Sequence, residues 1–295
     1  MAKIKFIFPC LALIILASGC AGHRFIKMPE QAEATLPELA ERMKAKRVVF
    51  IGEVHSSTSN HRMQLQVIEA LHEAGFPMAV GIEMFRADSQ KELDRWLAGG
   101  LDDEAFLKVY RDNWQMPWQR YRDIFLYAKR NNIPLVGLNI PWGIIRQVVK
   151  GGVKSLKPED SAGLTEVTCD VDESYQRLIR EALDEHEREK NAADKETAFK
   201  NFCEAQVVWD VSMARRIAGY LKENPGRNMV VLSGSAHSRK NGIPRNLSRL
   251  AGAGPDAAYI ILLPGVNDIL TPEDITAEDA DYIWTDPWGW LEFWD

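Results

Sequence analysis

The sequence predicts an α/β fold, in which a mainly parallel central sheet is flanked by helices and interrupted by an inserted helical subregion. Short apolar runs rich in β-branched residues recur along the chain, as expected of strands that are covered on both faces. Longer segments with apolar residues three or four positions apart separate these runs and end near glycine or proline. This alternation is typical of parallel strands linked by helical crossovers.

The first 20 residues have the pattern of a secretion signal. Lys3 and Lys5 give a basic start, residues 6–17 are almost entirely apolar, and small residues precede Cys20. This order resembles a bacterial lipoprotein signal, in which Cys20 carries the lipid, including palmitate, and becomes the first mature residue. A membrane-spanning anchor is the alternative, but the apolar run is shorter than the roughly 20 residues such a helix needs.

We therefore expect a signal peptide over residues 1–19, a tether over residues 20–36 and one α/β domain over residues 37–295. The lipid at Cys20 predicts a membrane partner and a place in the bacterial cell envelope, with the outer membrane favoured over the inner. The net charge of −6 argues against nucleic acid as a partner, because no basic stripe is present to neutralise phosphates.

The expected elements follow one another through the domain. The predicted strands are residues 47–51, 78–82, 133–138, 229–232 and 258–263. The predicted helices are residues 59–74, 89–97, 102–110, 118–130, 142–150, 172–190 and 196–223. The first strand, helix and strand predict a right-handed crossover and a parallel pair. Residues 154–195 are turn-rich and then highly charged, so we interpret them as a helical insertion.

Two cysteines remain in the domain, Cys169 and Cys203. An oxidising envelope would allow them to form a disulfide, but their sequence separation says nothing about their distance in space. We expect two buried free thiols, with the disulfide as the alternative.

Two Gly-x-x-His quartets, Gly52–His55 and Gly234–His237, each follow an apolar run that is predicted to be a buried strand. Glycine after a strand is often only a turn residue. Ligands of open α/β sheets bind outside the carboxyl ends of the strands, however, so both histidines are expected at one edge of the sheet. The two distant quartets therefore predict one shared pocket.

Polar residues end the other strands in the same way. Glu53 and His55 are two positions apart and point to the same side in extended backbone, while Glu83 and Asn139 end the second and third strands. We expect Glu53, Glu83 and the two histidines to lie together.

Several further residues are candidates for the wall of this pocket. His61 and Gln64 share a face of the first predicted helix, and Gln206 and Asp210 share a face of the long helix. Asp210 either orients a histidine, pairs with Arg86 or is a surface acid.

The set Glu53, His55, Glu83 and His237 offers oxygen and imidazole ligands that suit zinc, manganese or another divalent metal. The same residues could instead act as acid and base around a water molecule. The sequence has no Gly-x-Ser-x-Gly elbow, phosphate-binding glycine loop or dinucleotide fingerprint, which argues against serine hydrolases, NTPases and Rossmann oxidoreductases.

An ordered series of motifs resembles the ChaN-like family of haem-binding lipoproteins. The motifs are Gly52–His55, His61–Gln64, Gly81–Phe85, Leu138–Ile140, Ala205–Ala214, Gly234–His237 and Gly242–Pro244. The family shares a superfamily with Tiki metalloproteases, TraB-like proteins and erythromycin-esterase-like enzymes. The resemblance implies an envelope lipoprotein that binds haem and assists haem or iron uptake, with a homodimer as one arrangement.

The resemblance also implies a tyrosine ligand to the haem iron, for which Tyr175 is our candidate, with His186 beside it on the charged helix. Two hypotheses follow. The first is a non-enzymatic haem-binding lipoprotein, which we favour. The second is a metal-dependent hydrolase that uses Glu53, His55, Glu83 and His237.

Overall fold

The computed structural model describes residues 24–161, 163–164, 166–184, 192–251, 259–264 and 275–285. The expected signal peptide, Cys20 and His186 lie outside these residues. None of the described helices is both long enough and apolar enough to cross a membrane.

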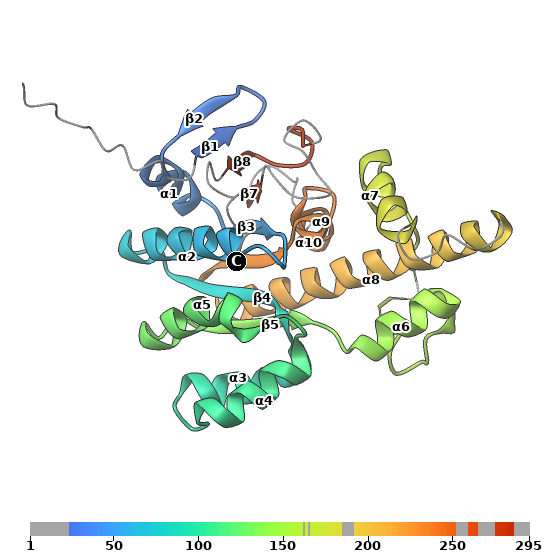
Figure 1. The fold of residues 1–295 in the computed structure, drawn as a ribbon, viewed down its shortest axis with the longest axis horizontal. Coiled ribbons are helices and arrows are strands. Elements are labelled where there is room, and N and C mark those ends of the chain that lie inside the picture. Colours follow the sequence, from blue (N-terminus) through green and yellow to red (C-terminus); the bar gives the residue numbers. More distant parts are fainter. Residues whose placement is uncertain are drawn as a thin grey trace, which may run out of the picture.

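The described residues form an eight-stranded, mostly parallel sheet in the order β2-β1-β8-β7-β3-β6-β4-β5 (Figure 1). The strands are β1 (Arg24–Lys27), β2 (Ala32–Ala34), β3 (Val48–Glu53), β4 (Met78–Arg86), β5 (Leu135–Asn139), β6 (Asn228–Gly234), β7 (Tyr259–Pro264) and β8 (Tyr282–Thr285). Strands β3 to β8 pair in parallel, whereas β1 pairs antiparallel with both β2 and β8. The α/β class and the mainly parallel sheet are thus confirmed.

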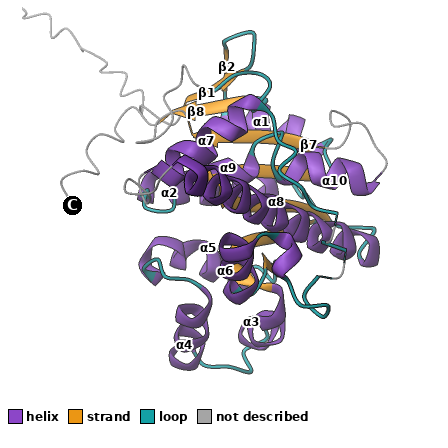
Figure 2. Ribbon diagram, turned by 90° about the vertical axis from the view of Figure 1, so that its right-hand side faces the viewer, coloured by secondary structure: helices purple, strands orange, loops and turns teal. Residues whose placement is uncertain are grey.

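Helices cover both faces of this sheet. They are α1 (Leu36–Lys44), α2 (Thr58–Glu73), α3 (Gln90–Leu97), α4 (Asp103–Asn113), α5 (Trp118–Arg130), α6 (Trp142–Gly151), α7 (Glu173–Asp184), α8 (Ala192–Glu223), α9 (Ser235–Ser238) and α10 (Ile243–Ala251), with short 3-10 turns η1 (Ala87–Ser89) and η2 (Val153–Ser155). Figure 2 shows the strands between the helical layers, with α8 crossing the sheet.

The alternation of side chains along each strand divides the core into two parts. Val49 and Ile51 of β3 belong to the core that includes α1, α2 and α5, whereas Val48 and Phe50 belong to the core that includes α8 and α10. Both sides are apolar, which is why the central strands read as continuous hydrophobic runs.

Strand β6 lies between β3 and β4, so the first crossover does not join neighbouring strands. The expected adjacent pair is therefore wrong in detail: β3 pairs with β6, and β6 pairs with β4. Insertion of a late strand between two early ones requires contacts between residues 150 to 181 positions apart, which local patterns do not encode.

The segment expected to be a tether is part of the sheet from Arg24 onward. Strands β1 and β2 form a hairpin that adds to β8, and Phe25 is buried. The next element, α1, starts with a capping box in which Thr35 and Glu38 bind each other's backbone N–H groups. Only residues 20–23 of the expected tether lie outside the described part.

The region expected to be a helical insertion contains η2, a loop and α7. Helix α8 begins before the predicted start, and Figure 1 shows α6 and α7 packed beside its outer half. Cys169 and Cys203 form a disulfide with Cα atoms 5.4 Å apart, which corrects the expectation of two free thiols. The bond joins the loop before α7 to α8, because the fold places these two segments side by side.

Candidate functional site

Three neighbouring strands, β3, β6 and β4, deliver the candidate site residues to one edge of the sheet. Their register aligns Glu53 with Gly234, so the two Gly-x-x-His quartets leave the sheet at the same level. Glu83 follows Ile82 on β4, at the start of an irregular stretch in the pairing with β5. Such irregularities re-aim side chains next to functional sites.

The first acid–imidazole pair comes from β3 and the turn after it. Glu53 Oε1 lies 2.7 Å from His55 Nδ1, and the Tyr121 hydroxyl donates a short hydrogen bond to the same oxygen. The Glu53 side chain is fully buried, while the His55 side chain is 30% exposed and meets Trp114 edge to face with ring centroids 5.0 Å apart. The carboxylate therefore holds an imidazole that solvent can still reach.

The second pair joins α8 to the end of β6. Asp210 Oδ1 lies 2.7 Å from His237 Nδ1, and the Tyr175 hydroxyl donates to Asp210 Oδ2 at 2.9 Å. All three side chains are buried, and Trp209 packs edge to face against the His237 ring. Of the alternatives left open for Asp210, the orientation of a histidine is the one that the structure confirms.

Glu83 lies between the two pairs. Its Oε1 is 3.9 Å from Nε2 of His55 and 3.9 Å from Nε2 of His237, and its Oε2 accepts the Gly234 N–H at 2.7 Å. Both imidazoles thus turn Nε2 toward one carboxylate. The expected approach of His55 and His237 is confirmed.

The glycine of each quartet allows the other quartet to come close. A Cβ atom on Gly234 would lie 3.1 Å from His55 Nε2, and one on Gly52 would lie 3.2 Å from Ser235 Cα and 2.6 Å from a methyl of Leu263. Neither glycine has a positive φ. They are required by close packing rather than by a turn.

The charges of the site stabilise each other despite burial. Burial alone would raise the pKa of Glu53, but His55 and His61 outweigh it and hold that pKa well below its usual range. Burial opposes the charged form of His55, yet the hydrogen bond to Glu53 and the charge of Glu83 raise the pKa of His55 to about 9. The two carboxylates thus favour positive charge at the His55 ring, whether a proton or a bound cation supplies it.

In the second pair, burial determines the direction of the pKa shift at Asp210 and Tyr175, but not at His237. It raises the pKa of Asp210 in spite of His237 and Tyr175, and it raises the pKa of Tyr175 far above the usual range, with Asp210 adding to the effect. Burial acts against the charge on His237, but Asp210 and Glu83 still raise the pKa of that imidazole.

His61 and Gln64 lie beneath Glu53, as expected of residues on the same face of α2. His61 Nε2 is 3.5 Å from Glu53 Oε1, and Gln64 Nε2 donates to the Ile51 carbonyl at 3.2 Å. In the described residues, several buried polar atoms without a hydrogen-bond partner gather here: Glu53 Oε2, both ring nitrogens of His61, Gln64 Oε1 and Trp114 Nε1. Buried polar atoms of this kind are potential contacts for ordered water or a ligand.

Asn139 supports the site from β5. Its side-chain amide donates to the Glu83 carbonyl at 2.9 Å, and its oxygen accepts from Trp209 Nε1 and from the Ile140 N–H. Asn139 therefore links β4 to α8 behind Glu83.

Arg86 has another position than expected, whereas the place of Gln206 in the pocket stays a prediction. Arg86 binds Asp88, Ser89 and the Asp112 carbonyl, so it does not pair with Asp210. It lies beyond the irregular stretch of β4, which carries its side chain toward the end of α4. Gln206 is half-buried on α8, one turn before Asp210.

Tyr175 is within the site, but behind Asp210 rather than in front of the histidines. Its role as a haem ligand stays a prediction, and His186 lies outside the described residues. Tyr121 and Trp114 were not predicted from the sequence. They lie on or beside helices α4 and α5, far from either quartet in sequence, and their aromatic character alone indicates a core position.

The four proposed metal ligands converge without forming a metal site. Among the described residues, no group of three or more His, Cys, Asp or Glu side chains has the arrangement needed to hold a metal ion. The Nδ1 atoms of both histidines are engaged with carboxylates. The arrangement is that of two acid–imidazole pairs around a third carboxylate.

Comparison with known protein families identifies the relationship. Residues 39–247 match the family described as haem-binding uptake, Tiki superfamily, ChaN. The chain belongs to the ChaN family. The matched range includes both quartets, Glu83 and Asp210, so the site described above lies within the family region.

Two solved structures and one curated protein are similar to this ChaN-family protein at low sequence identity. The structure of ChaN of Campylobacter jejuni with cofacial haem has a TM-score of 0.68, 15% identity and coverage of 89% of this chain and 96% of that chain. The erythromycin esterase EreC has a TM-score of 0.47, with 14% identity over 82% of this chain and 76% of that chain. Protein RETICULATA-RELATED 5 of Arabidopsis thaliana is 22% identical over 83% of this chain, which spans 34% of the length of that protein. At these identities, the structural likeness to ChaN establishes the shared fold.

Proposed function

We propose that this protein is a lipid-anchored haem-binding protein of the bacterial envelope that assists haem or iron uptake. Membership of a family described as haem-binding uptake supports haem as the ligand and uptake as the process. The lipoprotein-like pattern that ends at Cys20 supports the anchor, with the outer membrane as the favoured location. A haem-linked homodimer is part of the proposal, since the solved C. jejuni relative is described as binding haem cofacially.

The donor set of the site fits haem. Histidine is a common axial ligand of haem iron, and metal-binding imidazoles usually donate their other N–H to a carboxylate. Glu53 gives His55 this support, and Trp114 supplies an aromatic neighbour. Iron would take the place of the proton that Glu53 and Glu83 favour on the His55 ring. Bound haem would supply an iron centre.

The observation that carries the proposal is His55, a carboxylate-anchored imidazole that is 30% exposed, whereas the His237 side chain is 8% exposed. We therefore assign the iron to His55 in preference to Tyr175. The Tyr175 phenol is buried, donates to Asp210 and has a raised pKa, all of which oppose a phenolate ligand.

Haemin titration followed by visible absorbance tests this assignment, with protein that lacks residues 1–20, which precede every described element. We expect a Soret band that His55→Ala weakens strongly, with at least about a tenfold loss of affinity, equivalent to one ligand interaction. Tyr175→Phe should leave the band nearly unchanged. His72→Ala is the matched control, because His72 binds Tyr127 away from the site.

Absence of a Soret band in the unaltered protein would contradict haem binding. Loss of the band in Tyr175→Phe, with His55→Ala unaffected, would show that the phenol holds the iron. Sedimentation with and without haemin tests the homodimer.

A second candidate function is hydrolysis by acid–base chemistry. Two carboxylate-oriented imidazoles with Nε2 directed at a third carboxylate are an arrangement that moves protons around a bound water. Glu83→Gln should then abolish hydrolysis of an ester panel while leaving the Soret band intact. Metal analysis of the purified protein separates this chemistry from a metal-dependent reaction.

A further inference from the structure

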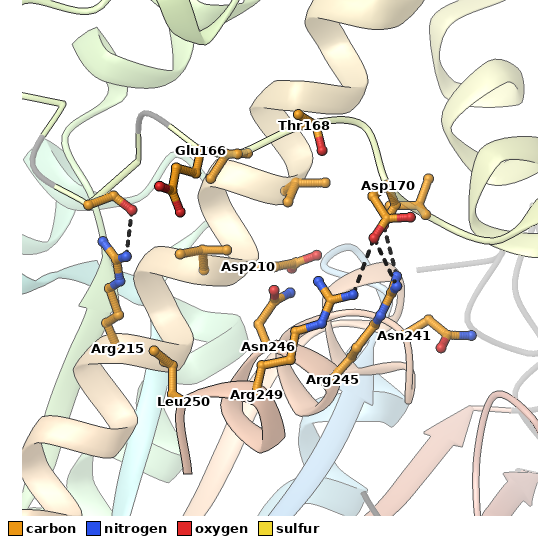
Figure 3. Close-up of a pocket in the computed structure, with 15 residues that line it drawn as sticks. Glu166, Thr168, Asp170, Asp210, Arg215, Asn241, Arg245, Asn246, Arg249 and Leu250 are labelled. Carbon is orange, nitrogen blue, oxygen red and sulfur yellow. Dashed lines mark hydrogen bonds and ion pairs between the residues drawn. The ribbon is translucent and has the colours of Figure 1, made fainter. Parts of the chain in front are cut away.

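A cavity of about 430 Å³ lies among α8, α10 and the loop that precedes α7 (Figure 3). Its wall includes Asp210, whose side chain also orients His237, but none of the other residues of the acid–imidazole cluster. The disulfide at Cys169 fixes the loop that closes one side of this cavity. The disulfide therefore stabilises the wall of this cavity, which is separate from the sheet edge where His55 is exposed.

Arginine side chains from two helices project into this space. Arg245 and Arg249 are one turn apart on α10, and Arg215 comes from α8. Figure 3 shows Arg245 and Arg249 reaching toward Asp170, while Arg215 lies at the other end beside Gly163. Guanidinium groups are the side chains that best match the planar geometry of a carboxylate.

Asp170 shows that these arginines can bind a carboxylate. Its Oδ2 lies 3.2 Å from Nη2 of Arg245 and 3.2 Å from Nη2 of Arg249, so one carboxylate is shared by two guanidinium groups. The Asp170 side chain is 67% exposed. Exposed ion pairs of this type contribute little to stability, so an incoming carboxylate could displace Asp170 at small cost.

The rest of the cavity wall indicates what kind of group the ligand carries beside its carboxylate. Val167, Val171, Val207 and Val211 make it partly apolar. The charged residues in the described lining are three arginines against Glu166, Asp170 and Asp210, and Asp210 is already paired with His237. Two guanidinium groups thus share one carboxylate in this cavity, beside an apolar wall.

We propose that this cavity binds a small organic acid, whose carboxylate replaces Asp170 at Arg245 and Arg249 and whose short apolar chain packs against the valines. The proposal is independent of haem binding. Because Asp210 forms part of the wall, the acid would lie behind the Asp210–His237 pair.

Equilibrium dialysis of the full chain in detergent, with labelled valerate as the probe, tests this site. We expect saturable binding at millimolar concentration, and pentanamide, which lacks the charge, should not compete. The double variant Arg245→Gln/Arg249→Gln should weaken binding at least about tenfold, the loss expected for charged hydrogen bonds. Arg122→Gln, at an exposed ion pair on α5, should leave affinity unchanged.

Asp170→Asn makes the test independent of a general loss of structure. This change removes the same two ion pairs as the double arginine variant, yet it should tighten valerate binding by about threefold because the internal competitor is gone. Weaker binding in Asp170→Asn would show that the ion pairs serve only to hold the loop, and would overturn the proposal. Absence of saturable valerate binding, equal binding of inorganic phosphate, or displacement of valerate by stoichiometric haemin would also overturn it.

Discussion

At the scale of single residues, the site depends on how a buried carboxylate changes an imidazole. Glu53 is fully buried and accepts from both His55 and Tyr121, so its charge is stabilised inside the protein. That charge, with Glu83 nearby, raises the pKa of His55 to about 9. The pKa of His55 is thus determined by the buried carboxylates beside it.

The raised pKa of His55 predicts a specific dependence of stability on pH. Unfolded His55 has a pKa near 6.5, so its contribution is fully present below pH 6.5 and is lost as pH rises through about 9. We expect the free energy of unfolding to fall by about 2 kcal/mol over this range, allowing for partial exposure of the side chain. Urea unfolding at pH 6.5 and at about pH 9 should show this loss of stability, and the loss should be much smaller in His55→Gln. An NMR titration that places the pKa of His55 near 6.5 would contradict the prediction.

The quartet glycines predict a second effect at the residue scale. Gly234→Ala would place a Cβ 3.1 Å from His55 Nε2, so we expect a folded protein with a displaced imidazole and an altered Soret titration. Gly52→Ala meets Leu263 at 2.6 Å and backbone at 3.2 Å, and should cost about 1–3 kcal/mol of stability. Gly143→Ala, where a Cβ meets no atom within 4 Å, is the control in urea unfolding. Equal stability of all three variants would contradict the close-packing explanation.

At the scale of elements, α8 connects the acid–imidazole cluster to the arginine-lined cavity. The helix carries Cys203, Asp210 and Arg215, which contribute to the disulfide, to the His237 pair and to the arginine-lined cavity. Helix α7 adds Tyr175, and its first turn is capped by the Asp172 side chain, which accepts from the Tyr175 N–H. The loop, α7 and α8 therefore act together to position Asp210.

Loss of the disulfide should weaken this unit. The bond closes a sequence separation of 34 residues, and its removal is expected to cost about 2–4 kcal/mol. Urea unfolding of the oxidised protein with and without reductant measures this cost, with Cys169→Ala/Cys203→Ala as a control that reductant should not affect. Identical midpoints for the oxidised and reduced protein would show that packing of α7 on α8 suffices without the bond.

At the scale of the whole molecule, strand order creates the site. Because β6 lies between β3 and β4, the ends of three adjacent strands present Glu53 with His55, the Gly234–His237 quartet and Glu83. The hairpin of β1 and β2 extends the opposite end of the sheet. It places the start of the described chain on the sheet side farthest from β5.

Anchoring of the whole molecule gives a further prediction. If Cys20 is lipidated, the protein should be recovered in the detergent-extracted membrane fraction, and Cys20→Ala should move it out of that fraction. Cys169→Ala should remain with the membrane, because Cys169 is bonded to Cys203 within the domain. Retention of Cys20→Ala in the detergent fraction would instead favour an uncleaved apolar anchor.

The sequence by itself determined the strands that carry the site and the residues at their ends. Strand periodicity and the two quartets are local features, so they suffice to assign Glu53, His55, Glu83 and His237 to one sheet edge. Only the tertiary structure decided that Asp210 binds His237 while Arg86 lies elsewhere, that Tyr121 reaches Glu53, and that Cys169 pairs with Cys203. These contacts join residues that are 26 to 68 positions apart in the sequence. They depend on how helices pack on the sheet, which the pattern within any one segment does not specify.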